Sequence, residues 1–276
     1  MNYGFSYSVL IPFRGSTDLL MKTLTSIPDR EDIQVIVADD NDVPVALDFE
    51  YSNAELAYFA VEDHRGAGHA RNCALEKVNG RYILFCDSDD YFAKGAFDIM
   101  DRFLSVENDI TFFNVDSKCL VGFWPAFRHW RKRIYVRRYL RDGSEINLRY
   151  RWDAPWGKMF RTEFILSGGF RFGETMVSND DMFSVRTGHA ALRIGVDAGV
   201  PVYFAIKRKG SLSRTKTKGC MFTNYCVHIE KLAFLVEVGR EDLCNRLWMH
   251  QLRALAFFGF GEYKRYRAYA KQHLGI

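Results

Sequence analysis

Short apolar runs alternate with segments of helical spacing through the first half of the chain, and this alternation restricts the fold more than any other feature. The apolar runs cover residues 7–13, 33–40, 57–61 and 81–87, and the segments of helical spacing cover residues 16–27 and 66–78. A strand that is apolar on both faces is typical of a parallel sheet, where helices cover both sides. The alternation therefore predicts an α/β protein with a mostly parallel, doubly wound sheet.

Length and composition agree with a globular protein. The 276 residues are 48% hydrophobic, which is enough apolar material for one large α/β domain or two small ones. The six cysteines form no CxxC pair, so we expect free thiols in a reducing cytoplasm. The first residues lack the features of a signal peptide, and no run reaches the roughly 18 apolar residues of a membrane-spanning helix. We therefore expect a cytoplasmic protein, soluble or attached only to a membrane surface.

Carboxylates follow two of the apolar runs. Asp39 and Asp40 end the second run, and the stretch FCDSDDY places Asp87, Asp89 and Asp90 after the fourth. Ligands of doubly wound sheets bind at the carboxyl ends of the strands, so both clusters should face one crevice. Such a stretch can also be a solvated turn, because Asp and Ser are common turn residues. Three like charges repel, however, unless a cation such as Mg²⁺ or Mn²⁺ offsets them.

Five stretches together resemble a known family. They are SVLIPFRG (8–15), VIVADDND (35–42), GAGHARNCALEKVNGRYILFCDSDDYF (66–92), PWGKMFRTEFI (155–165) and SNDDMF (178–183). In this order and spacing they resemble family 2 glycosyltransferases of the GT-A fold, particularly the bacterial enzymes that build capsule, lipopolysaccharide and other surface glycans. The resemblance extends from residue 7 to about residue 215 and leaves out the last part of the chain.

The resemblance implies a Rossmann-like GT-A fold, with a mostly parallel sheet flanked by helices. Residues 1–218 would form this domain, with a nucleotide-sugar half over about 1–116 and an acceptor half over about 117–218. The helical pattern that follows predicts a C-terminal extension over 219–276. The implied activity is metal-dependent, inverting transfer of a hexosyl or N-acetylhexosaminyl group from a nucleotide sugar, UDP-linked, to a glycan or lipid-linked acceptor.

Carried over residue by residue, the resemblance also implies a donor site. Pro12 and Arg14 would lie where the chain passes the nucleotide base, and Asp40 would hydrogen-bond a uracil ring. Arg71 would lie near the base and the diphosphate. Trp156 would lie near the sugar or the acceptor, and a core position for Trp156 is an equal alternative.

The same resemblance implies a metal site and a catalytic base. Asp89 would bind Mn²⁺ or Mg²⁺ directly, and Asp87 would contact the ribose, or the metal through water. Asp181 would take the proton from the acceptor hydroxyl, although Asp180 stands where the family has Glu and the choice between the two stays open. We expect the helix dipole to lower the pKa of this base. We also expect Asp90 to cap the turn that follows.

Two other functions stay open. A nucleotidyltransferase-like sugar-nucleotide enzyme would share the sheet and the metal, but it would normally have a Gly-rich phosphate loop, and PFRGSTD is a poor one. A membrane- or nucleic-acid-binding module on a GT-A scaffold is the non-enzymatic alternative, and the intact Asp40, Asp89 and Asp181 argue against it. GAGHAR lacks the third glycine of a dinucleotide motif, which disfavours an oxidoreductase.

Positive charge is concentrated in two stretches. Residues 124–141 hold seven Lys or Arg and no acid, and residues 207–219 hold six Lys or Arg. The first stretch has three interpretations. It is a solvated face, or it is a surface that binds an anionic or lipid-linked acceptor or an anionic membrane. The third interpretation, a nucleic-acid surface, is the least favoured because the predicted crevice is acidic. The basic and aromatic residues 263–272 support peripheral membrane contact. The second stretch is a solvated loop or a lid, with Arg208 or Arg214 reaching a phosphate.

Overall fold

The computed structural model describes residues 3–119, 129–207, 217–244 and 247–274. The strands are β1 (Phe5–Phe13), β2 (Ile33–Asp39), β3 (Glu55–Ala60), β4 (Gly80–Phe85), β5 (Tyr91–Phe92), β6 (Ile110–Phe113), β7 (Val115–Cys119), β8 (Lys158–Arg161), β9 (Ile194–Asp197) and β10 (Tyr203–Lys207). The helices are α1 (Thr17–Thr25), α2 (Ala67–Leu75), α3 (Ala96–Asp101), α4 (Trp130–Asp142), α5 (Ile146–Arg151), α6 (Thr162–Ser167), α7 (Asp181–Ala190), α8 (Lys218–Glu237), α9 (Leu247–Phe258) and α10 (Phe260–Leu274), with a 3₁₀ turn at Glu241–Leu243.

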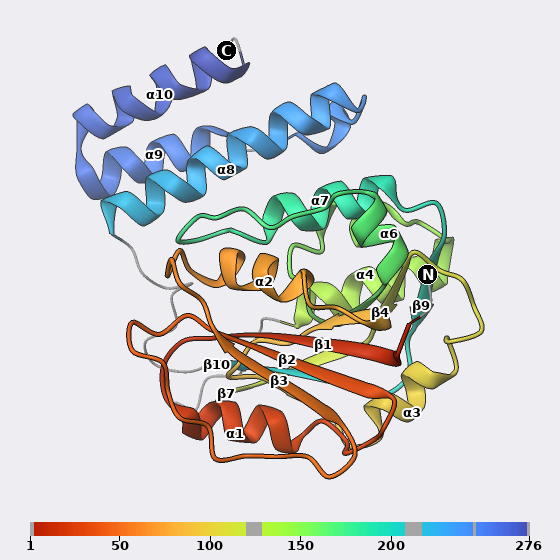
Figure 1. Ribbon diagram of the computed structural model, residues 1–276. Helices are drawn as coiled ribbons and strands as arrows, with labels where there is room; N and C mark the ends of the chain where they lie inside the picture. The colour runs from red at the N-terminus through yellow and green to blue at the C-terminus, as the bar shows by residue number, and fades with distance from the viewer. Residues whose placement is uncertain (1–2, 120–128, 208–216, 245–246, 275–276) are drawn as a thin grey trace.

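A seven-stranded sheet in the order β3-β2-β1-β4-β8-β6-β9 forms the centre of the protein (Figure 1). The pairs β2/β3, β1/β2, β1/β4 and β6/β9 are parallel, whereas β8 runs antiparallel to β4 and β6. Helices α2, α6 and α7 lie on one side of the sheet, and α1 and α3 lie on the other. The expected α/β architecture, a mostly parallel sheet flanked by helices, is confirmed.

The continuous apolar runs explain why the central strands form. Every residue of β2 is buried, and so are the last seven residues of β1. A strand with both faces buried needs helices on both sides of the sheet. Helix α1, which follows β1 in the chain, covers one side, and helix α2, which follows β3, covers the other. The three adjacent strands β1, β2 and β4 run parallel, so their carboxyl ends lie together along one edge of the sheet.

The sequence predicts one strand over residues 109–116, but the structure divides it. β6 belongs to the main sheet, and β7 belongs to a second, three-stranded sheet in the order β5-β10-β7. Asn114 lies between them, and its backbone N–H donates to the carbonyl of Asp197 while its carbonyl accepts from Val202. Those partners lie about ninety residues further along the chain, so local sequence does not reveal the break.

Helices α8, α9 and α10 form the predicted helical C-terminal extension (Figure 1). α8 packs against α7 through a cluster that includes Met182, Val185 and Leu232. The sequence predicts a shared apolar face for Leu243, Leu247, Trp248, Leu252 and Leu255, but Trp248 is 60% exposed and Leu252 is 47% exposed. α9 instead turns the small residue Ala254 toward the rings of Tyr225 and Tyr266, so its bulky residues face solvent. The side chain of Leu247 lies outside the described residues.

Candidate active site

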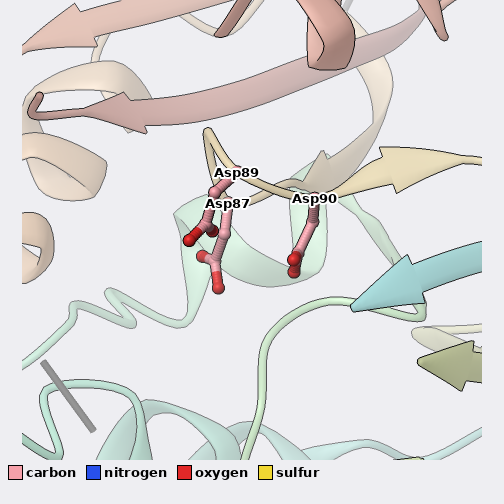
Figure 2. A group of neighbouring side chains, drawn as sticks. All are labelled: Asp87, Asp89 and Asp90. Atoms are coloured by element: carbon pink, nitrogen blue, oxygen red, sulfur yellow. The ribbon is translucent and has the colours of Figure 1, made fainter. Parts of the chain in front are cut away.

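Asp87, Asp89 and Asp90 follow the end of β4 and come close together. A carboxylate oxygen of each lies within 4.8 Å of one from each of the others. Figure 2 shows the side chains of Asp87 and Asp89 side by side, with Asp90 further along the loop. Figure 2 and the distances agree with the expected acidic cluster at a strand end.

Asp90 does not cap the turn that follows it, as the sequence predicted. Its side chain is buried, and it accepts hydrogen bonds from the Tyr203 hydroxyl at 2.7 Å and the Ile206 backbone N–H at 2.6 Å. Burial, with the charges of Asp87 and Asp89, raises the pKa of Asp90 well above its usual value. Asp90 therefore attaches the acidic loop to β10.

The remaining pair, Asp87 and Asp89, fits a divalent cation. Both side chains are partly exposed, in contrast to Asp90, whose two oxygens already accept hydrogen bonds. Mg²⁺ and Mn²⁺ are usually held by one or two carboxylates, with water and substrate phosphates completing the shell. The donor set is therefore suitable for such an ion.

Arg71 joins the acidic loop to the start of α7. Its guanidinium donates to Asp87 Oδ1 at 2.6 Å and to Asn179 Oδ1 at 3.0 Å, and its side chain is almost fully buried. The position of α2 depends on Gly68, since a Cβ atom there would lie 2.0 Å from the Gly173 carbonyl oxygen. α2 therefore lies directly against the segment that leads into α7.

Asp40, directly after β2, is a buried carboxylate without a hydrogen-bond partner. It is 2% exposed, and neither of its side-chain oxygens accepts a hydrogen bond among the described residues. The nearest basic nitrogen atoms are Arg14 Nη1 at 3.7 Å and His64 Nδ1 at 3.8 Å. Burial raises the pKa of Asp40, although Arg14, His64 and the nearby backbone N–H of Gly66 act in the opposite direction. A buried acceptor without a donor is unfavourable alone and suits a ligand that brings an N–H group.

The neighbours of Asp40 at this edge have different roles. Asp39 accepts from the Asn41 and Val45 backbone amides and from the Tyr58 hydroxyl, so it holds its own loop. Arg14 is half exposed and donates to Asp42 at 2.9 Å and to the Asp40 carbonyl. Pro12 is a buried residue of β1 that lies opposite Ala38 in the sheet.

The acid pair lies at the start of α7. The sequence predicts Ser178 or Asn179 as the helix cap, but the N-cap is Asp180, and Asn179 accepts from Arg71 instead. Burial raises the pKa of Asp180, and burial together with the charge of Asp180 raises the pKa of Asp181. The expectation of a lowered pKa is therefore wrong, because desolvation and like-charge repulsion outweigh the helix dipole.

The structure adds polar residues that the sequence did not single out for this side of the site. Lys132 of α4 donates to Asp153 Oδ1 at 2.6 Å, and the charge of Asp153 contributes to the raised pKa values at Asp180 and Asp181. Lys158 is 3% exposed and donates to the Trp152 carbonyl at 2.9 Å. Burial lowers the pKa of Lys158 to about 7. The sequence allows a surface position for Lys158, and the structure contradicts it because the side chain is buried.

Trp156 packs against Tyr203, the residue whose hydroxyl bonds to the acidic loop at Asp87 and Asp90. It is 3% exposed and stacks on the Tyr203 ring, with the ring centroids 5.3 Å apart. Lys132 Nζ lies over the Trp156 ring, 5.5 Å from its centroid. A role in sugar or acceptor binding stays a prediction, and in this structure the ring supports Tyr203. Arg208 and Arg214, predicted for the lid, lie outside the described residues.

A family model described as glycosyl transferase family 2 matches residues 8–173, more than half of the chain. The chain is 25% identical over 213 residues to poly(ribitol-phosphate) β-N-acetylglucosaminyltransferase TarS of Staphylococcus aureus, covering 74% of this chain and 36% of TarS. It is 29% identical over 104 residues to UDP-Glc:α-D-GlcNAc-diphosphoundecaprenol β-1,3-glucosyltransferase WfaP of Escherichia coli, covering 36% of this chain and 41% of WfaP. The chain therefore spans only about two fifths or less of these relatives' lengths.

Solved structures share the fold. A crystal structure of S. aureus TarS 1-349 in complex with UDP-GlcNAc superposes with a TM-score of 0.65 at 20% identity, covering 92% of this chain and 73% of that one. A mannosyltransferase from Pyrobaculum calidifontis in complex with GDP-Man and Mn²⁺ superposes with a TM-score of 0.57 at 14% identity, covering 98% of this chain and 84% of that one. The GT-A fold expected from the sequence is confirmed by these likenesses.

Proposed function

Because this chain belongs to glycosyl transferase family 2, we propose that it is an inverting, metal-dependent glycosyltransferase. It moves a sugar from a nucleotide sugar to a hydroxyl of a glycan or lipid-linked acceptor in bacterial surface-polysaccharide synthesis. The arrangement around Arg71 supports this best, since its contacts with Asp87 and Asn179 bring the acidic loop and the acid pair to one site. Such transfer needs both a site for the diphosphate and a base for the acceptor.

The surroundings of Asp40 favour a uracil base in the donor. The Asp40 carboxylate is buried and accepts no hydrogen bond of ordinary geometry among the described residues, and the N–H group of uracil could donate one. Arg14 is half exposed, and its Nη1 atom lies 3.7 Å from the Asp40 carboxylate, so its side chain can also contact a base bound at Asp40. The resemblance to the UDP-GlcNAc-binding TarS structure is consistent with a UDP-linked hexose or N-acetylhexosamine.

Asp89 and Asp87 would hold the cation, and Arg71 would fix Asp87 in position. A bound Mn²⁺ or Mg²⁺ would take up the charge that develops on the departing diphosphate. Asp90 contributes through its hydrogen bonds to β10, which keep the loop in place while the donor binds. Positioning of this kind provides much of the rate in a transfer reaction.

Asp181 would accept the proton from the acceptor hydroxyl as that oxygen attacks the anomeric carbon. Its raised pKa favours this role, because a carboxylate of ordinary acidity is a weaker base. Attack from the face opposite the leaving diphosphate inverts the anomeric configuration. Asp180 is adjacent and also has a raised pKa, so it is the alternative base.

A cytoplasmic location is proposed with this function. None of the six cysteines forms a disulfide among the described residues, which suits a reducing compartment. None of the described helices combines the length and the apolar character needed to cross a bilayer.

The donor site is tested by titrating the purified protein with a panel of nucleotide sugars, with and without Mn²⁺. We expect metal-dependent binding of a UDP-sugar and a loss of at least about tenfold in affinity in Asp89→Ala, because a metal-ligating carboxylate is removed. Asp48→Ala is the matched control, since Asp48 is an exposed carboxylate outside the site. Metal-independent binding, or an unchanged affinity in Asp89→Ala, would contradict the proposal.

The base is tested with Asp181→Asn, which keeps the size of the side chain and removes its basicity. Transfer should fall by about 10²–10⁴-fold while the affinity for the donor stays within about twofold. Asp180→Asn, measured in parallel, should retain more activity. A wild-type transfer rate in Asp181→Asn would move the role to Asp180 or to another residue.

A further inference from the structure

α4 presents an outer face that combines positive charge with exposed apolar side chains. Its inner side is held by Val136 and Lys132, which are 2% and 8% exposed. Trp130 is 58% exposed, Ile134 is 38% exposed and Leu140 is 59% exposed. Trp130 and Ile134 are four residues apart, so they lie on the same side of the helix. Three large apolar side chains on a thirteen-residue helix are therefore directed to solvent.

Five arginines lie around these apolar residues: Arg131, Arg137, Arg138 and Arg141 are exposed, and Arg133 is half-buried. α4 contains a single acid, Asp142, which lies at its end and pairs with Arg138 at 3.7 Å and Arg141 at 2.9 Å. Arg137 and Arg141 continue the line of Trp130 and Ile134 along the helix. This set, the five arginines with Trp130, Ile134 and Leu140, is called the α4 outer face. Five positive charges against one negative charge make it strongly cationic.

The combination favours a lipid surface over a soluble polyanion. Arginine alone would bind a phosphodiester polymer or a nucleic acid. The bases of a single strand could stack on Trp130, but neither kind of polymer would offer an apolar partner to Ile134 and Leu140 on the outside of α4. An anionic bilayer offers both partners, since basic residues contact phosphate headgroups while Trp and aliphatic side chains enter the boundary of the acyl chains. Tryptophan is enriched at that boundary because it is apolar with one polar N–H.

We propose that the α4 outer face docks the protein on the surface of an anionic lipid bilayer. The arginines contact headgroup phosphates, and Trp130, Ile134 and Leu140 enter the interfacial layer. The inner side of the same helix reaches the candidate active site, because Lys132 binds Asp153 and lies over Trp156. Docking through α4 therefore brings the side of the site near Asp181 to the membrane, where a lipid-linked acceptor would be. That last step, and not the docking itself, rests on the proposed function.

The test is sedimentation of the whole protein with vesicles of phosphatidylcholine containing about 30% phosphatidylglycerol, and with phosphatidylcholine alone. We expect binding to the anionic vesicles only. Replacing Arg131, Arg137 and Arg138 together by Gln should weaken that binding by about a hundredfold, since each base near an anionic surface contributes about fivefold to the affinity. The double variant Trp130→Ala, Ile134→Ser should bind anionic vesicles about tenfold or more weakly than the wild-type protein. It should also lose the vesicle binding that the wild-type protein retains at high salt.

Matched controls come from the C-terminal helices, and they also test the expectation from the sequence that residues 263–272 support membrane contact. Replacing the exposed Lys264, Arg267 and Lys271 of α10 by Gln removes the same charge, and Trp248→Ala with Leu252→Ser removes the same kind of exposed apolar pair from α9. Both controls should bind anionic vesicles within about threefold of the wild-type protein. Equal losses in the α10 control would show that only net charge matters and would overturn the assignment to α4.

Two further outcomes would also overturn the proposal. One is the absence of binding to anionic vesicles by the wild-type protein. The other is binding of single-stranded DNA as tightly as vesicles, with Trp130→Ala and Ile134→Ser changing neither. UDP-sugar binding by each variant is measured alongside, since retention shows that the variant is folded. A wild-type protein that binds vesicles but no nucleotide sugar would contradict the proposed function and leave the docking surface intact.

Discussion

Asp40 and Asp90 are both almost fully buried carboxylates, yet their hydrogen bonding differs. Asp90 accepts two short hydrogen bonds from β10, whereas Asp40 accepts no hydrogen bond of ordinary geometry among the described residues. A buried polar group without a partner costs about 1–3 kcal/mol, so it persists where a ligand completes it. The contrast separates a residue that holds the loop from one that is suited to bind the donor.

The acid pair makes stability depend on pH. The folded protein raises the pKa of Asp180, so its protonated form is favoured in the folded state and unfolding releases that proton. The stability connected with it is therefore present at low pH and falls as pH rises through the folded pKa. Asp180→Asn removes this loss, and we expect it to stabilise the protein by about 1–2 kcal/mol at about pH 8 and by less at about pH 5.

Thermal unfolding of Asp180→Asn and the wild-type protein at the two pH values checks this. Asp48→Asn is the control, because Asp48 is exposed and should shift the melting temperature equally little at both pH values. A larger stabilisation at the lower pH would reverse the sign and contradict the raised pKa.

At the scale of elements, β10 supports the acidic loop from behind. The Tyr203 hydroxyl donates to Asp90 Oδ2 at 2.7 Å and accepts from the Asp87 backbone N–H at 3.1 Å. Tyr203→Phe removes both bonds and leaves the buried Asp90 with one donor fewer. We expect a loss of about 1–3 kcal/mol in stability and a weaker affinity for the nucleotide sugar, because the loop that carries Asp87 and Asp89 is less constrained.

Denaturant unfolding and donor titration measure the two effects. Tyr91→Phe is the matched control, because the Tyr91 ring stacks on Phe204 in the same small sheet and does not depend on its hydroxyl for that contact. Wild-type donor affinity in Tyr203→Phe would show that β10 does not position the acidic loop.

At the scale of the whole molecule, the described residues form one large core around the main sheet and two small clusters under the C-terminal helices. The second cluster joins α8 to α7, the helix that begins with the acid pair. Leu232, 6% exposed, is part of it. Leu232→Ala should lower the free energy of unfolding by about 2–5 kcal/mol, since it leaves a cavity between the two helices.

Chemical denaturation measures this loss, and Leu252→Ala provides the comparison. Leu252 is 47% exposed on α9, so the same truncation there should cost less than about 1 kcal/mol. Equal effects of the two substitutions would mean that α8 is not packed against α7 as the structure has it. The division of the chain at residues 218 and 219 into two domains stays a prediction.

The sequence by itself determined the parallel strands and the acidic strand ends. β1, β2 and β4 are continuous apolar runs, and Asp40, Asp87 and Asp89 follow them at positions that local pattern reveals. The resemblance pointed to Arg71 and to the acid pair. These features depend on neighbouring residues in the chain, which is why they were predictable.

Only the tertiary structure decided what each of these groups contacts. Asp90 bonds to a strand more than 110 residues away, Asn114 breaks a predicted strand through partners near residue 200, and Lys158 is buried by segments that the sequence does not connect to it. The raised pKa values of Asp180 and Asp181 arise in the same way, because desolvation depends on how distant segments pack and outweighs the local helix dipole. Local pattern places charged residues at the edge of a sheet, and long-range packing determines which of them are buried, paired or available to a ligand.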